Sequence, residues 1–259
     1  MALTAQAVSD LAAQPRFVGA QVGILMVLHT WSGPLHHHPH VHLLVTGGGV
    51  TADGSRWHQA SSRFLVPVKL LSRMIRQRFA AALRQHHPEL YAQVPPSAWT
   101  QAWCTWCQPF GAGAPAVLSY LGRYVFRIAL TNRRLLHMDD THVTFQYKVR
   151  ATGAWRRERL PGVDFLARFL LHVLPKGFHK VRYHGLWHPS RRPLHTAIRL
   201  LLPPTPPHGD VDPARPSTDP AAGGLAPAPG ARPARCPACG STLLRQLQQT
   251  RRGSPVMVT

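Results

Sequence analysis

Two histidines, His40 and His42, stand at a spacing that could hold a metal ion just before an apolar run. On a β-strand, residues i and i+2 point to the same face, so both imidazoles can reach one cation while Val41 packs into the core. Neutral imidazole is a common ligand of divalent ions that polarise phosphoryl oxygens. The alternative is chance, since the chain holds 17 histidines. The metallo-hydrolase pattern HxHxDH is excluded, because Leu44 and Val45 replace its Asp and last His.

A third ligand is expected, because two imidazoles alone bind magnesium or manganese weakly. If residues 22–31 and 40–47 form a β-hairpin, His29 lies opposite about residue 41 or 42, and the register decides whether it faces the ion. We therefore predict His29 as the third ligand.

The segment Tyr120-Leu-Gly-Arg-Tyr124 contains the candidate nucleophiles. On a helix, residues i and i+4 share one face, so the two phenols can reach the same cleft. Arg123 and Arg127 are close in sequence, and cationic neighbours favour the phenolate that attacks a phosphate. The alternative is that the two tyrosines only pack, and Gly122 weakens the helical interpretation.

The charge balance points to a polyanionic partner, with nucleic acid as the first candidate. Thirty Lys and Arg stand against ten Asp and Glu, a formal net charge of +20 over 259 residues. A GC-rich genome would supply part of the Arg, Ala, Pro and Gly without selection for binding. With 44% apolar residues, the chain can bury a core.

The apolar stretches and the four cysteines bear on the cellular location and on zinc binding. No apolar stretch is long enough to span a bilayer and the start lacks a signal peptide's order, so we expect a cytoplasmic protein without membrane contact. Cys104/Cys107 and Cys236/Cys239 are too few for a disulfide framework. Because the two pairs lie about 130 residues apart, structural zinc is not expected.

Hydrophobic periodicity predicts a mixture of strands and helices. We expect an α+β domain with an antiparallel sheet at its centre, the histidines on a central strand and the tyrosine helix packed across it. The second strand is expected to end at Gly47–Gly49. The expected elements are strands at 22–28 and 41–45, a helix at 67–86, a short strand within 103–110, a hairpin of 143–149 with 155–160, a helix at 163–174 and a strand within 178–187.

Three regions follow from composition. Residues 1–202 are expected to form the compact catalytic region. Between 203 and 234, Pro, Ala and Gly are so dense that neither helix nor sheet can persist, which predicts a disordered linker. Residues 235–259 form a tail with a single CxxC.

Three separated blocks carry a family resemblance: HTWSGPLHHHPHVHLLVTGGG, YLGRYVFRIALTNRRLL and FLLHVLPKGFHKVRYHGL. In order and spacing they resemble the two-tyrosine HUH transposases of rolling-circle insertion sequences, over about residues 18–190. The resemblance implies that His40 and His42 bind a divalent cation, Mg²⁺ or Mn²⁺. It also implies that Tyr120 and Tyr124 attack DNA.

The implied reaction is cleavage of single-stranded DNA, which leaves a 5′-phosphotyrosine and a free 3′-OH. The second tyrosine allows a further cleavage, and attack of a 3′-OH on the covalent bond rejoins strands. No small-molecule cofactor is expected, and the oligomeric state is left open. The predicted DNA contacts are Arg123, Arg127, Lys148, Lys176, Lys180 and Arg182.

Family members usually carry an N-terminal cysteine-rich zinc-binding region before the first block, and we expect this chain to lack it. The rival hypothesis is a catalytically inactive, basic DNA-binding remnant of such a transposase. A third class, RNA-binding proteins, predicts aromatic stacking motifs on strands, and the sequence offers none that convinces.

Overall fold

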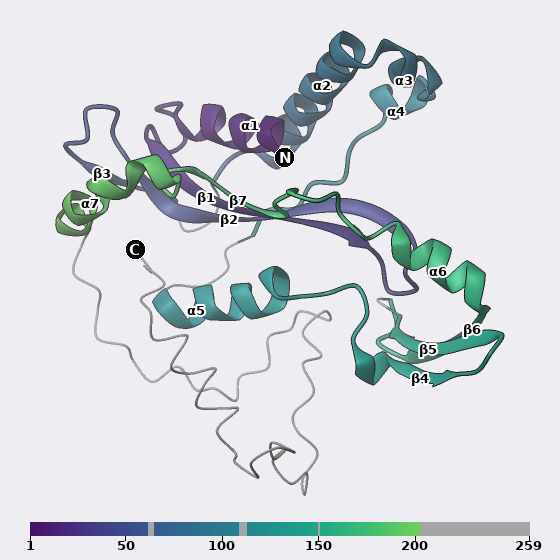
Figure 1. The fold of residues 1–259 in the computed structure, drawn as a ribbon. Coiled ribbons are helices and arrows are strands. Elements are labelled where there is room, and N and C mark those ends of the chain that lie inside the picture. Colours follow the sequence, from purple (N-terminus) through teal and green to yellow (C-terminus); the bar gives the residue numbers. More distant parts are fainter. Residues whose placement is uncertain (62–64, 109–112, 150, 203–259) are drawn as a thin grey trace, which may run out of the picture. The chain divides into compact units, whose positions relative to one another are not determined.

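A computed structural model describes residues 1–61, 65–108, 113–149 and 151–202. Helices accompany two antiparallel sheets, one of four strands in the order β3-β2-β1-β7 and one of three in the order β4-β5-β6 (Figure 1). The predicted α+β class with an antiparallel central sheet is therefore confirmed. The predicted linker and tail, 203–234 and 235–259, lie outside the described residues.

The chain consists of two compact units. The described helices and strands lie within residues 1–147 and 155–202, except that one strand ends at Lys148 in the second unit. Of the described residues, 148–149 and 151–154 belong to the second unit, and the Val149 N–H donates to the Ala154 carbonyl. None of the helices in the described ranges is long and apolar enough to cross a membrane.

The central hairpin carries the histidines. Its sheet consists of β1 (Gln21–Trp31), β2 (His37–Val50), β3 (Trp57–Gln59) and β7 (Val181–Gly185). The predicted hairpin is confirmed, but its register differs from the expected one. His29 lies opposite His40 and Val27 opposite His42, with a register shift between His29 and Trp31.

The prediction that the second strand ends at its glycines is wrong, because β2 continues to Val50. A Cβ at Gly49 would collide with the Gln21 backbone, and a Cβ at Gly48 would collide with Trp57 and the His58 carbonyl. The glycines therefore allow the neighbouring strands to approach closely, and they do not terminate the strand.

The two faces of the sheet are covered by different helices. Val22, Ile24 and Met26 point into a core shared with α1 (Ala2–Ala12) and α2 (Val68–His86). Leu25 and Val27 point to the opposite face, where they pack with Tyr120 at the end of α5 (Gly113–Tyr120). In Figure 1, α1 and α5 accordingly lie on opposite sides of the sheet. The helix predicted at 67–86 is α2, and it is confirmed.

The tyrosine segment is helical but not a regular α-helix. Tyr120 is the last residue of α5, and a single π-helical turn, Leu121–Val125, contains Tyr124. Such turns are frequent at functional sites. The prediction that one helical segment carries both tyrosines is confirmed.

The remaining elements correct two predictions. Residues 102–108 are irregular, not a strand, and the last two residues of the range predicted to contain it, 109–110, lie outside the described residues. Trp103 instead packs on Phe79 of α2, and its indole N–H donates to the Ala98 carbonyl. The helix predicted at 163–174 ends at Leu170, because His172 turns away to hydrogen-bond Thr30 and Leu35. The predicted hairpin of 143–149 and 155–160, and the predicted strand within 178–187, are confirmed.

These further elements complete the described fold: α3 (Pro88–Gln93), α4 (Ser97–Thr100), the 3-10 turns Asn132–Arg134 and Pro189–Leu194, β4 (Leu135–Met138), β5 (His142–Lys148), β6 (Trp155–Pro161), α6 (Gly162–Leu170) and α7 (His195–Leu201).

Candidate metal centre and tyrosine pair

His29, His40 and His42 form a cluster in which each offers one ring nitrogen within 4.8 Å of the other two. His29 and His40 are paired across β1 and β2, and His42 is two residues further along β2. All three rings lie on the face that carries the tyrosines. The predicted juxtaposition of His40 and His42 with His29 is therefore present in the structure.

Backbone carbonyls orient two of these rings. The Nε2–H of His29 donates to the Tyr124 carbonyl at 2.7 Å, and the Nδ1–H of His40 donates to the His38 carbonyl at 2.7 Å. The lone pair then belongs to the other ring nitrogen of each, Nδ1 of His29 and Nε2 of His40. When one ring nitrogen of a histidine binds a metal, the N–H of the other ring nitrogen often donates to a backbone carbonyl.

The protonation state of His29 suits a ligand. Its side chain is buried, with 2% of the residue exposed. Burial is the main cause that lowers the pKa of His29 to about 4, and the positive charges of Arg127 and Lys180 act in the same direction. His29 is therefore neutral at physiological pH, as metal coordination requires.

The two tyrosines occupy different environments beside this cluster. The Tyr124 ring centroid lies 4.2 Å from that of His42, and Tyr120 lies 4.8 Å from Tyr124. Tyr124 is partly exposed, whereas only 4% of Tyr120 is exposed. Burial, together with the neighbouring Tyr124, raises the pKa of Tyr120. Tyr124 is thus the phenol nearer the histidines and the more accessible one.

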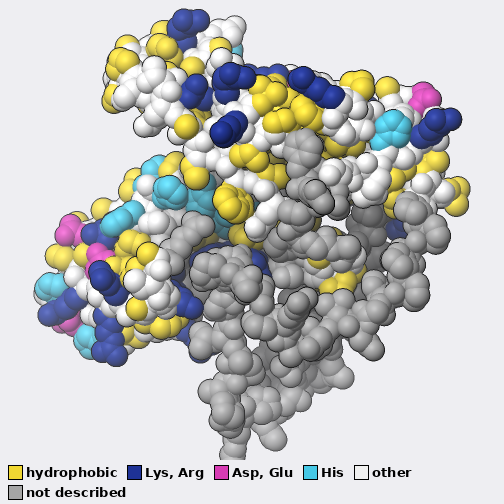
Figure 2. Space-filling model, turned by 180° about the vertical axis from the view of Figure 1, so that it is seen from behind, with side chains coloured by type: hydrophobic (Ala, Val, Ile, Leu, Met, Phe, Trp, Pro, Cys, Tyr) yellow, Lys and Arg dark blue, Asp and Glu magenta, His cyan; other side chains and the backbone are white. Residues whose placement is uncertain are grey.

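The six residues predicted to contact DNA lie in different surroundings. Arg127 and Lys180 lie together, with the Lys180 ammonium donating to the Arg127 carbonyl at 3.3 Å. Arg123 lies in the π-helical turn with Tyr124. The Arg182 guanidinium lies over the Phe178 ring, and Lys176 and Lys148 are exposed. Figure 2 shows histidine side chains gathered on one face, with Lys and Arg side chains around them.

Trp31 was not among the predicted site residues. Its indole stacks on the His29 ring, with a centroid distance of 4.6 Å. The signal was available, because Trp31 is two residues after His29 on the same strand and therefore on the same face. Thr30 and His172 were also missed, and their hydrogen bond depends on a long-range contact that periodicity does not reveal.

Comparison with known proteins agrees with the predicted family. Residues 23–193 match the family model Y2_Tnp, described as "Putative transposase", and the chain belongs to this transposase family. It is 38% identical over 199 residues to "Putative transposase y4qJ" of Sinorhizobium fredii, covering 70% of this chain and 50% of the relative.

A second relative is the "Transposase for insertion sequence element IS801" of Pseudomonas savastanoi pv. phaseolicola. It is 29% identical over 187 residues, which cover 64% of this chain and 43% of the relative. The chain thus spans about half the length of the curated relatives it matches. No solved structure matches it.

Proposed function

We propose that this chain carries the catalytic centre of a transposase that cleaves and rejoins single-stranded DNA through a 5′-phosphotyrosine. One observation carries the proposal: Tyr124 contacts the histidine cluster through its ring and holds His29 through its carbonyl. A nucleophile that contacts candidate metal ligands in these two ways lies beside the position where a metal-bound phosphate would be.

His29, His40 and His42 fit a divalent cation, because three imidazoles each offer one ring nitrogen and these atoms lie within 4.8 Å of one another. The donor set consists of imidazole nitrogen atoms, which divalent transition ions accept more readily than Mg²⁺ does. When bound, the ion would polarise the non-bridging oxygens of the scissile phosphate.

Tyr124 is the first nucleophile in this proposal. Its phenolic oxygen attacks phosphorus and loses its proton, the tyrosyl O–P bond forms, and the bond from phosphorus to the 3′-oxygen breaks. The departing 3′-oxygen takes up a proton. The DNA 5′ end stays on Tyr124, and the free 3′-OH of an incoming strand later reverses the step, so the phosphodiester energy is conserved.

Tyr120 then serves the second cleavage. Its burial and raised pKa make it the weaker nucleophile in the resting site. A second strand can be cut only after the Tyr120 phenol becomes accessible to the DNA. Two phenols with a centroid distance of 4.8 Å allow one to hold a strand end while the other attacks.

The test is incubation of the chain with end-labelled single-stranded DNA and Mn²⁺, followed by denaturing electrophoresis. A protein–DNA adduct that survives denaturation is expected, and the double variant Tyr120→Phe/Tyr124→Phe should form none. DNA binding without any adduct from the wild type would favour the inactive DNA-binding remnant. An adduct that persists in the double variant would refute the tyrosine assignment.

A further inference from the structure

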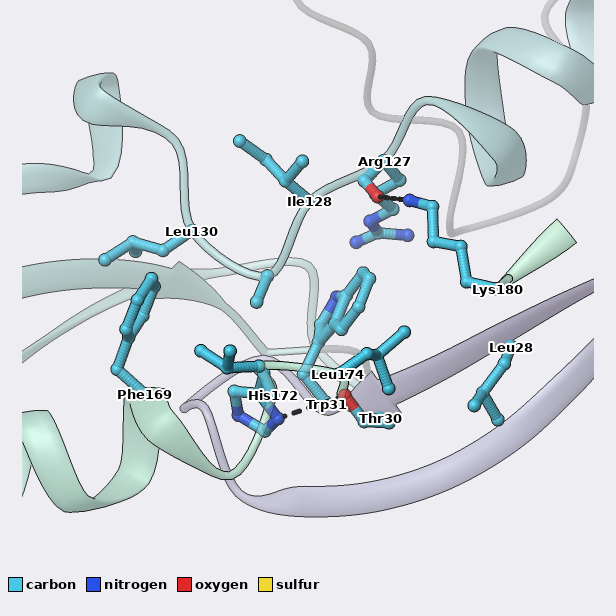
Figure 3. A pocket seen from close by; sticks show the side chains of 12 residues that line it. Leu28, Thr30, Trp31, Arg127, Ile128, Leu130, Phe169, His172, Leu174 and Lys180 are labelled. Carbon is cyan, nitrogen blue, oxygen red and sulfur yellow. Dashed lines mark hydrogen bonds between the residues drawn. The ribbon is translucent and has the colours of Figure 1, made fainter. Parts of the chain in front are cut away.

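A cavity of about 320 Å³ lies at the end of β1 that β7 leaves uncovered (Figure 3). β7 pairs with β1 only as far as Val27, and one more bond follows, from the Leu28 N–H to the Lys180 carbonyl. Beyond this point, residues 127–130, which follow the tyrosines, and residues 169–174, at the end of α6, form the walls. The cavity is therefore built from the segments that also position the candidate active site.

The walls are apolar and open to solvent. Ile128 is 54% exposed, Val173 59% and Phe169 37%, and all three line the cavity. Large apolar side chains exposed around a hollow are typical of a binding site. The ligand must therefore offer an apolar surface.

The cavity also offers a stacking surface and positive charge. The Trp31 indole lines it, and Arg127 and Lys180 lie at the same cavity. Among the described lining residues there is no carboxylate. Aromatic rings beside cationic side chains are the combination that binds the bases and phosphates of single-stranded nucleic acid.

A polar group lies between the apolar walls. Because the His172 Nε2–H donates to the Leu35 carbonyl at 3.0 Å, His172 Nδ1 accepts from the Thr30 hydroxyl at 3.2 Å. Figure 3 shows this bond at the cavity. The Thr30 oxygen keeps lone pairs that can accept from an N–H on the edge of a base.

We propose that this cavity takes one unstacked base of the DNA strand, stacked on Trp31 with its edge at Thr30 and its phosphate at Arg127 and Lys180. This inference rests on the proposed function, because the strand would be the one cleaved at the histidines. Trp31 stacks on His29, so the base lies next to the phosphate at the metal centre. The pocket thereby sets the register of the strand relative to the nucleophile.

The experiment separates base binding from phosphate binding. Fluorescence anisotropy measures the affinity of the protein for two labelled probes of about 16 nucleotides, a length that one single-strand binding groove can cover. One is oligothymidylate, and the other is an all-abasic strand with the same phosphates. The Tyr120→Phe/Tyr124→Phe background prevents covalent capture. We expect this double variant to bind oligothymidylate about tenfold to a hundredfold more tightly than the abasic strand, the range of base–aromatic stacking.

Four further variants in this background test whether the preference belongs to the cavity. Trp31→Ala and Ile128→Glu should reduce the oligothymidylate-to-abasic ratio toward one, whereas Trp31→Phe, which keeps a ring, should retain most of it. Leu200→Glu places the same new charge on another exposed apolar residue, 83% exposed, and should leave the ratio unchanged. If Trp31→Ala unfolds, Ile128→Glu still tests the cavity, because its side chain is exposed.

The outcomes distinguish the two proposals. A wild-type ratio near one, or a ratio that survives both Trp31→Ala and Ile128→Glu, overturns the base pocket. The transposase proposal then still stands if the adduct forms. If the chain binds neither probe and forms no adduct, both proposals fail.

Discussion

The imidazole of His29 donates a 2.7 Å hydrogen bond to the main-chain carbonyl of Tyr124. This bond connects the buried member of the histidine cluster to the turn that carries the nearer phenol. Tyr124 therefore cannot shift along its helix without disturbing His29. Tyr124 lies one residue before the end of the π-helical turn, where the last carbonyls of a helix have no partner further along the helix and can accept from a side chain.

The first prediction concerns the metal ligands. His42→Ala should lower Mn²⁺ affinity by more than about a hundredfold, since loss of an outer partner alone costs about 10–100-fold. Adduct formation should disappear, while salt-sensitive DNA affinity remains, because Lys and Arg contacts to phosphate supply it. Titration calorimetry with Mn²⁺ and anisotropy at several salt concentrations measure these effects. His86→Ala, an exposed histidine at the end of α2, is the control.

The second prediction is the order of the two tyrosines. Tyr124→Phe should abolish the adduct formed in a single encounter, because Tyr124 is the phenol beside His42. Tyr120→Phe should retain that adduct but lose the second cleavage. Peptide mapping of the wild-type adduct should place the nucleotide on Tyr124. A nucleotide found only on Tyr120 would reverse the proposed order.

The third prediction follows from the lowered pKa of His29, in the chain freed of metal by a chelator. The fold disfavours the protonated ring, so the stability contributed by neutral His29 is present above about pH 6.5 and is lost as the pH falls through about 4. Urea unfolding across this window should show a steeper loss for wild type than for His29→Gln. His86→Gln should follow the wild type, and equal slopes for wild type and His29→Gln would contradict the burial argument.

Much of the site was predictable from local patterns. Strand alternation places His40 and His42 on one face, and a hairpin brings His29 to them when its register places His29 on that same face. The register was not predictable, because a shift between His29 and Trp31 changes which residues pair. A local pattern does not reveal such an irregularity.

Long-range contacts explain the other errors. Periodicity extends the helix to residue 174, but His172 gains bonds to Thr30 and Leu35, which are about 140 residues away in sequence. The irregular segment around Trp103 is held by Phe79 of α2, not by strand neighbours. In both places, tertiary packing overrides local preference.

A fourth prediction concerns Gly185, where β7 ends against β1. Its φ is +60°, and a Cβ there would collide with the Val22 carbonyl. Gly185→Ala should therefore detach this end of β7 and destabilise the fold, whereas Gly177→Ala should cost less. Gly177 also has a positive φ, of +81°, but open space around its Cβ position. Thermal unfolding of the two variants compares them, and equal losses would show that φ alone matters.

The last prediction concerns Arg134, which joins three segments around the site. Its guanidinium donates to the carbonyls of Gly33 at 2.7 Å, Ala129 at 2.9 Å and Gln146 at 2.8 Å. Burial is the main cause that lowers its pKa. These bonds hold the loop of the central hairpin, the segment after the tyrosines and β5 together.

Lysine cannot replace this planar fork, because a single ammonium does not reach three carbonyls in different directions. Arg134→Lys should lower the free energy of unfolding by about 2 kcal/mol or more, the scale of bonds to a charged group. Oligothymidylate affinity should fall as well, since Ala129 and Ile128 form the cavity wall. Arg133→Lys, at the exposed neighbouring position, keeps charge and location and should change neither property. Denaturant unfolding and anisotropy compare Arg134→Lys with Arg133→Lys. Equal unfolding midpoints for the two variants would mean that Arg134 does not hold the segments together.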